Sequence, residues 1–79
     1  MELKVMYFGM IAEATNCREE IISVGNRCSI YQLENLLKDK YQNLQPISFK
    51  IAVDKEILQN DILLTPNTEI ALLPSFAGG

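Results

Sequence analysis

The sequence predicts an α+β fold in which one mixed β-sheet packs against one main helix. Two stretches with strand-like patterns precede a helical stretch, two more follow it, and a strong helix-start signal stands between the two pairs. The length of 79 residues is enough for one domain. The order strand, strand, helix, strand, strand therefore indicates the layers, although it leaves open which strands are neighbours.

The first element is a strand from Leu3 to Phe8, whose side chains alternate between two faces. Leu3, Val5 and Tyr7 share the face that we expect to be core. The other face begins with charged residues and ends with Met6 and Phe8. We therefore expect two apolar side chains on an otherwise solvated face.

A short helix and a second strand are expected next. Residues 9–14 leave room for one or two helical turns, and Asn16 is a plausible left-handed cap. Residues 18–24 are rich in isoleucine and valine and end at Gly25-Asn26. This pattern predicts a strand that pairs antiparallel with the first one.

The main helix is predicted from Ser29 to about Tyr41. Ser29 and Gln32 have the spacing of a capping box, in which each side chain caps a backbone N–H group of the other residue. Apolar residues then recur at three- and four-residue steps and form one stripe: Ile30, Leu33, Leu37, Tyr41 and Leu44. Pro46 prevents much continuation of the helix.

A third strand is predicted from Ser48 to Asp54, again with alternating faces. Phe49, Ile51 and Val53 are expected to point inward, and Lys50, Ala52 and Asp54 outward. A turn at Asp54-Lys55-Glu56 leads to a short piece at Ile57 and Leu58.

The last strand is predicted from Glu69 to Leu73, after a turn over residues 65–68. Its alternation sends Ile70 and Leu72 to the core and leaves Leu73 on the solvated face.

Composition and charge exclude several classes of function. The net charge of −3 and the scattered five lysines and two arginines argue against a nucleic-acid partner. The chain contains no histidine and no glycine-rich phosphate loop, so neither the usual neutral-pH base nor a common nucleotide site is present. We expect neither a metal site nor a self-contained active site.

The remaining composition indicates a cytoplasmic protein. No apolar run approaches the length of a membrane span, and the N-terminal MELKVMYF has an acid where a signal peptide has bases. Membrane partners are therefore not expected. Cys17 and Cys28 are too few for a disulfide framework, and we interpret them as small buried or half-buried thiols.

Two stretches, KVMYFGMIAEATN and NTEIALLPSFAGG, together resemble the small subunits of molybdopterin synthase. These proteins are ubiquitin-like β-grasp sulfur carriers that open with a strand and a short apolar helix and close with a hydrophobic strand, a proline and Gly-Gly. The resemblance covers nearly the whole chain and is most specific over residues 69–79. Ala12-Glu13 stands where family members often carry Arg-Glu.

The resemblance implies a β-grasp sheet of about four or five strands on one main helix, with the first and last strands parallel at its centre. Phe8 and Leu73 would then be neighbours. With Met6 and Ile57 they would form an apolar patch, and such a patch usually marks a protein interface.

The resemblance also divides the chain into a β-grasp domain over residues 1–73 and a flexible C-terminal tail over residues 74–79. Pro74 would end the strand, and Phe76 would anchor the tail in a partner groove or fold back over the apolar patch. Glycines at the end allow close approach to a buried site. The residues expected to thread into partners are Pro74, Ser75, Phe76, Ala77, Gly78 and Gly79.

The chemistry implied by the resemblance takes place at the carboxyl group of Gly79. A ubiquitin-activating-like adenylyltransferase would use ATP to adenylate it, and a sulfur donor protein would convert it to a thiocarboxylate. The large synthase subunit would supply the catalytic residues and take the sulfur for a cyclic pyranopterin precursor. No permanently bound cofactor is expected.

Four other interpretations of the sequence stay open at this point. The chain could be a thiamine-pathway sulfur carrier, a ubiquitin-like modifier joined to lysines through Gly79, or an interaction module whose tail has no chemical role. Sulfur could also travel as a persulfide on Cys17 or Cys28. An iron–sulfur ferredoxin is excluded, because the usual clusters need four thiolates.

Overall fold

The structure, a computed structural model, describes residues 1–75 of the chain. The elements in these residues are β1 (Glu2–Tyr7), α1 (Met10–Thr15), β2 (Glu19–Ser23), α2 (Ile30–Lys40), the 3-10 turn η1 (Gln42–Leu44), β3 (Phe49–Val53), β4 (Glu56–Ile57) and β5 (Glu69–Pro74). Over this range the sheet has the strand order β2-β1-β5-β3-β4. None of these helices is long and apolar enough to span a membrane.

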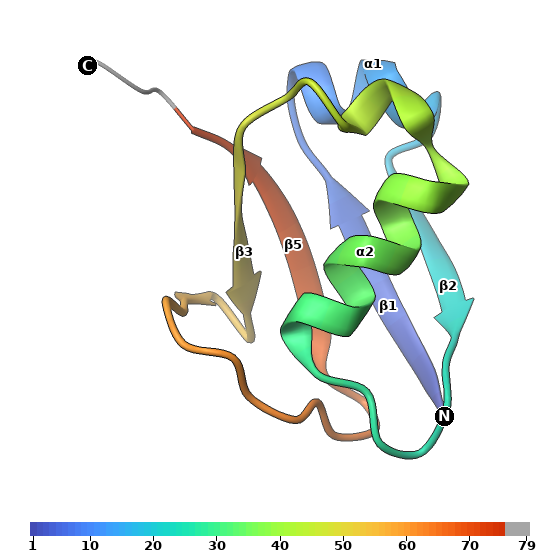
Figure 1. Ribbon diagram of the computed structural model, residues 1–79, viewed down its shortest axis with the longest axis vertical. Coiled ribbons are helices and arrows are strands. Elements are labelled where there is room, and N and C mark those ends of the chain that lie inside the picture. Colours follow the sequence, from blue (N-terminus) through green and yellow to red (C-terminus); the bar gives the residue numbers. More distant parts are fainter. Residues whose placement is uncertain (76–79) are drawn as a thin grey trace.

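Strands β1 and β5 are parallel neighbours at the centre of the sheet, with pairs from Lys4 opposite Glu69 to Tyr7 opposite Leu72. The other strand pairs are antiparallel. Figure 1 shows β1 and β5 ending at the same edge of the sheet, beside α1. The β-grasp fold implied by the resemblance is confirmed.

The core lies between the sheet and α2, which crosses one face of the sheet (Figure 1). Alternate residues of the central strands and the predicted helical stripe are buried there: Leu3, Val5, Tyr7, Ile70, Leu72, Ile30, Leu33, Leu37 and Leu44. Tyr41 is half-buried at the C-cap of α2. The predicted faces of both central strands and the buried helical stripe are thus confirmed.

The predicted caps of both helices are also present. The backbone N–H of Gln32 donates to the Ser29 hydroxyl at 3.2 Å, and the backbone N–H of Ser29 donates to the Gln32 side chain at 2.8 Å. Asn16 ends α1 in the left-handed conformation, with φ 60° and ψ 31°. Local signals thus mark these helix ends. Tertiary bonds add to the start of α2, because the N–H groups of Ile30 and Tyr31 donate to the Ile62 carbonyl and the Asp61 carboxylate, each at 3.0 Å.

The first four strands end within one residue of the predicted bounds: 2–7 for the predicted 3–8, 19–23 for 18–24, 49–53 for 48–54 and 56–57 for 57–58. Two further differences concern β5 and the burial of β3. The last strand is one residue longer than predicted, because Pro74 still pairs with Phe49. Ala52 lies on the outward face of β3, as the alternation predicts, yet it is only 3% exposed. Its methyl group lies between Ala71 and Ile57 and is shorter than the side chains around it, so neighbours cover it.

A polar cluster that the sequence analysis did not predict joins β2 to the C-terminal end of α2. The carboxylate of Glu20 accepts hydrogen bonds from the hydroxyls of Tyr7, at 2.6 Å, and Tyr41, and from the ammonium group of Lys40 at 3.0 Å. The rings of Tyr7 and Tyr41 meet edge to face, 6.0 Å apart. Glu20 therefore ties three elements together.

This cluster changes the acid–base properties of its members. Burial alone would raise the pKa of Glu20, but hydrogen bonds from Tyr41, Tyr7 and Lys40 hold the pKa of its carboxyl below the ordinary value. Burial, together with the hydrogen bond to Glu20, raises the pKa of both tyrosine hydroxyls. The folded state thus favours a charged carboxylate beside neutral phenols.

We predict that Glu20→Gln lowers the free energy of unfolding at pH 7 by about 1 to 3 kcal/mol, since hydrogen bonds to a charged group are lost. Glu20 has a lower pKa in the folded than in the unfolded chain, so its stabilisation is present above the unfolded value of about 4.3 and disappears as the pH falls through the folded value. Urea titrations from neutral to acidic pH should therefore show the stabilities of wild type and variant converging in acid.

Glu19→Gln is the matched control, because the exposed Glu19 makes only a surface ion pair with Lys4. Its effect at pH 7 should stay below about 1 kcal/mol. A difference in the free energy of unfolding between wild type and Glu20→Gln that stays constant at every pH would contradict the role given to the Glu20 charge.

Candidate functional site

The candidate site is the sheet face opposite α2, which we call the open face. Within residues 1–75, no helix packs on this face. The strand register puts one row of side chains across it, in the order Glu19, Met6, Ala71, Ala52 and Ile57. Ile57 is 49% exposed, and the two alanines separate it from Met6.

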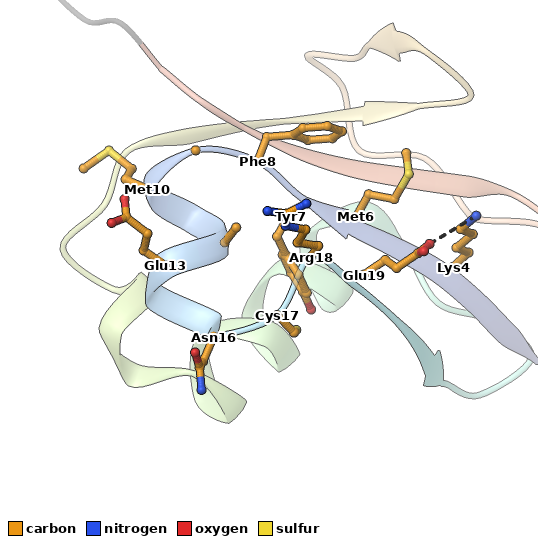
Figure 2. A pocket seen from close by; sticks show the side chains of 12 residues that line it. Lys4, Met6, Tyr7, Phe8, Met10, Glu13, Asn16, Cys17, Arg18 and Glu19 are labelled. Atoms are coloured by element: carbon orange, nitrogen blue, oxygen red, sulfur yellow. Dashed lines mark ion pairs between the residues drawn. The ribbon is translucent and has the colours of Figure 1, made fainter.

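Phe8 follows β1 directly and lies beside β5. Its backbone N–H donates to the carbonyl of Leu72 at 3.3 Å, which brings Phe8 next to Leu73. Figure 2 shows Phe8 and Met6 leaving β1 on one side, whereas Tyr7 points to the other. The structure thus brings Met6, Phe8 and Leu73 together, and we call these three residues the apolar patch; Ile57 lies on the same face at the sheet edge.

Charged side chains surround the apolar patch. Lys4 and Glu19 form an ion pair at 3.2 Å, drawn as a dashed line in Figure 2. Lys50 pairs with Leu73 in the register of β3 and β5. An apolar centre with a charged rim is the usual composition of a protein–protein interface.

The depression next to the patch is shallow and open. Its lining includes Phe8, Met10, Glu13 and Arg18, and Figure 2 shows these side chains around the junction of β1 and α1. Such a shape suits a protein surface better than an enclosed small-molecule pocket, which is concave and largely buries its ligand.

The root of the C-terminal tail lies at the same end of the sheet as Phe8. Pro74 pairs with Phe49, and the backbone N–H of Ser75 donates to the carbonyl of Ser48 at 3.1 Å. The other predicted tail residues, Phe76, Ala77, Gly78 and Gly79, lie outside the described residues. The last described residues, Pro74 and Ser75, therefore follow directly on Leu73 of the apolar patch.

Three residues near this end were not singled out by the sequence analysis. Met10, at the start of α1, is exposed next to the patch; Gly9 contacts Pro74; and Ser48 bonds the tail root. A glycine directly after a strand was the signal available for Gly9. Nothing in the sequence pointed to Ser48, because its contact depends on the pairing of β3 with β5.

Neither cysteine belongs to the apolar patch, although Cys17 lines the same depression as Met6 and Phe8. Cys28 is buried, and this burial, with Asp61 nearby, raises the pKa of its thiol, which disfavours the reactive thiolate. Cys17 is half-buried, and its thiol donates to Thr15 at 3.7 Å and Glu20 at 3.8 Å. Among residues 1–75, no group of three acidic, cysteine or histidine side chains could hold a metal ion.

Comparison with known proteins places this geometry in a family. The model of the ThiS family matches residues 5–79. The human molybdopterin synthase sulfur carrier subunit is 31% identical over 83 residues, covering 99% of this chain and 94% of that protein. The similarity therefore extends over the tail as well as the domain.

Solved structures agree with this similarity. A chain in the complex of subunits 1 and 2 of molybdopterin-converting factor from Helicobacter pylori 26695 is 27% identical, with a TM-score of 0.73 and complete coverage of both chains. Small archaeal modifier protein 1 from Methanosarcina acetivorans is 26% identical, with a TM-score of 0.79, covering 99% of this chain and 96% of that one.

A third structure supports the fold alone. The putative molybdopterin converting factor subunit 1 from Pyrococcus furiosus has a TM-score of 0.88 at 18% identity, covering 94% of this chain and 97% of that one.

We predict that Phe8→Ser changes the free energy of unfolding by less than about 1 kcal/mol, because 43% of the Phe8 side chain is exposed. Leu72→Ala, two strand positions from the tail root and fully buried, should cost about 2 to 5 kcal/mol. Urea denaturation followed by circular dichroism measures both values. Comparable losses in the two variants would mean that the open face is part of the core.

Proposed function

The chain belongs to the ThiS family, and we propose that it acts as the sulfur carrier subunit of a molybdopterin synthase. The observation that carries this proposal is the similarity to a sulfur carrier subunit over 99% of the chain. The geometry supports it, because the apolar patch, with Phe8 exposed and Met6 and Leu73 half-buried, lies beside the root of the tail. A docked partner would thus receive the tail at the edge of the same interface.

The proposed reagent is the carboxyl group of Gly79. A carboxylate is a poor electrophile, so an adenylyltransferase first uses ATP to form an acyl-adenylate and releases pyrophosphate. Sulfide, or the outer sulfur of a donor persulfide, then attacks the acyl carbon: the bond to the AMP oxygen breaks, a carbon–sulfur bond forms, and AMP leaves. With a persulfide the product is an acyl disulfide, which a donor thiol cleaves to the thiocarboxylate as the donor forms a disulfide. The resulting thiocarboxylate ionises at neutral pH and presents anionic sulfur, the reactive form of a thiol group.

The tail has the composition that this delivery requires. Four residues follow Ser75, and a fully extended chain of that length spans at most about 14 Å. Gly78 and Gly79 have no side chains that would obstruct a narrow passage, while Phe76 supplies apolar contact area. The body of the domain must therefore dock close to the partner's buried site.

We assign the docking role to the apolar patch and its charged rim. The Helicobacter pylori structure is a complex of subunits 1 and 2 of molybdopterin-converting factor, and by analogy the partner here is a large synthase subunit that holds the pterin precursor. Met6, Phe8 and Leu73 would lie at the interface centre, Ile57 nearer its edge. Interface centres carry most of the binding energy.

A second candidate function is protein modification through Gly79. The 26% identity to small archaeal modifier protein 1 favours it. Both functions begin with adenylation of Gly79. They differ in the acceptor, because a modifier forms an isopeptide bond with a lysine amine and releases the AMP or sulfur bound to its terminal acyl group. Peptides carrying the C-terminal segment of this chain on a lysine would be its signature.

We predict that Gly79 gains sulfur when the wild-type chain is incubated with the adenylyltransferase, ATP and a sulfur donor. Intact mass spectrometry should show one carboxyl oxygen replaced by sulfur. A variant with one phenylalanine added after Gly79 should keep its fold and gain no sulfur, because the added side chain blocks the tail's entry. Sulfur loading of the extended variant would contradict the proposal, and loading of neither chain would refute it.

A second experiment, with the sulfur-loaded wild-type chain, identifies the acceptor. Transfer of sulfur to the pterin precursor on the large subunit supports the synthase function. Capture by a thiazole synthase, or appearance of isopeptide-linked lysines without pterin product, would instead favour the thiamine-pathway carrier or the modifier.

We predict that Leu73→Ser weakens binding to the large subunit at least tenfold, the loss typical of an apolar residue at an interface centre. Leu36→Ser is the matched control, since Leu36 lies on α2 and is 37% exposed. Isothermal titration calorimetry measures both affinities. Equal affinities for the two variants would remove the open face from the interface.

A further inference from the structure

Gly9, at the junction of β1 and α1, has a backbone conformation that other residues rarely adopt. Its φ is 56° and its ψ is −133°, a combination largely restricted to glycine. Gly9 also starts α1, because its carbonyl accepts the N–H groups of Ala12 at 3.1 Å and Glu13 at 3.3 Å. The chain thus turns sharply at the point where the apolar patch ends.

The absence of a side chain at Gly9 allows the ring of Pro74 to lie against it. A Cβ atom at position 9 would be 3.1 Å from Cγ and 3.9 Å from Cδ of Pro74. The shorter distance is tighter than ordinary van der Waals contact. Gly9 and the first residue of the tail therefore share a fitted contact.

The neighbouring residue of the tail is held by Ser48, which directly precedes β3. The N–H of Ser75 donates to the carbonyl of Ser48 at 3.1 Å, next to the pair formed by Phe49 and Pro74. Contacts with Gly9 and with Ser48 thus act on two successive residues. We call Gly9, Ser48, Pro74 and Ser75 the tail clamp.

We propose that Gly9 is a positioning residue, which acts through Pro74 to set the direction in which the tail leaves the domain. This inference rests on the proposed function, in which the tail must enter a partner's site while the apolar patch is docked. Four residues beyond Ser75 leave little length to correct a wrong starting direction. A fixed root also lowers the conformational entropy lost on entry.

The first test measures the clamp itself, independent of function. The variant is Gly9→Ala. Gly25→Ala is the matched control, because within residues 1–75 no heavy atom other than those of its chain neighbours lies within 4 Å of a Cβ at Gly25. Amide hydrogen exchange by NMR should be about tenfold faster at Ser75 in Gly9→Ala, with Leu37 in the core of α2 changed less than about threefold. Gly25→Ala should match the wild type at both residues.

The second test separates positioning from docking in the reaction with the adenylyltransferase. Gly9→Ala should lower kcat for pyrophosphate release at least tenfold and change KM less than about threefold, since the apolar patch still docks. Adding Pro74→Ala to Gly9→Ala should recover part of kcat, because the steric conflict with the ring is gone. If Gly9 had a purely structural role, adding Pro74→Ala would not restore any of the kcat lost in Gly9→Ala.

If Gly9→Ala fails to fold, Pro74→Ala alone replaces it in both tests, because this variant leaves the backbone of Gly9 unstrained. It should speed exchange at Ser75 and lower kcat about threefold or more. Unchanged exchange at Ser75 and unchanged kcat in the folded variants would overturn the proposal. If the wild-type chain is not adenylated at all, the proposed function fails, and the exchange rates at Ser75 alone support or refute the clamp.

Discussion

Two parallel strands, β1 and β5, lie at the centre of the sheet. Their pairing determines where the apolar patch lies relative to the start of the tail. Parallel strands end at the same edge of a sheet. The register from Lys4 to Tyr7 against Glu69 to Leu72 therefore brings Phe8 next to the start of the tail, although more than sixty residues separate them in the sequence. An antiparallel pairing would have put the apolar patch and the tail at opposite ends.

The two faces of this sheet carry different tasks. The face toward α2 is filled with buried aliphatic side chains, and the Glu20 cluster fastens the end of α2 to β2 through hydrogen bonds to one charged group. Most of the buried apolar surface that stabilises the domain therefore lies on this face. The other face carries Met6, Phe8 and Leu73, the residues that we propose for docking, and a small domain can leave such a patch uncovered because most of its core lies elsewhere.

Local patterns in the sequence predicted much of this arrangement. The alternation around Val5 and Leu72 identified the buried faces, Ser29 and Gln32 marked the start of α2, and Asn16 marked the end of α1. The Glu20 cluster, the burial of Ala52 and the contact of Gly9 with Pro74 were not predicted. Each arises between strands or helices that are distant in sequence, so it depends on strand order and register, which local periodicity does not encode.

The central claim is that the open face and the tail root meet one partner together. Hydroxyl-radical footprinting of this chain, alone and bound to the large synthase subunit, tests this claim most directly. Oxidation of Met6, Phe8 and Met10 should fall strongly in the complex, while oxidation of Leu36 on α2 stays unchanged. Protection of Leu36 with undiminished oxidation of Met6 and Phe8 would contradict it.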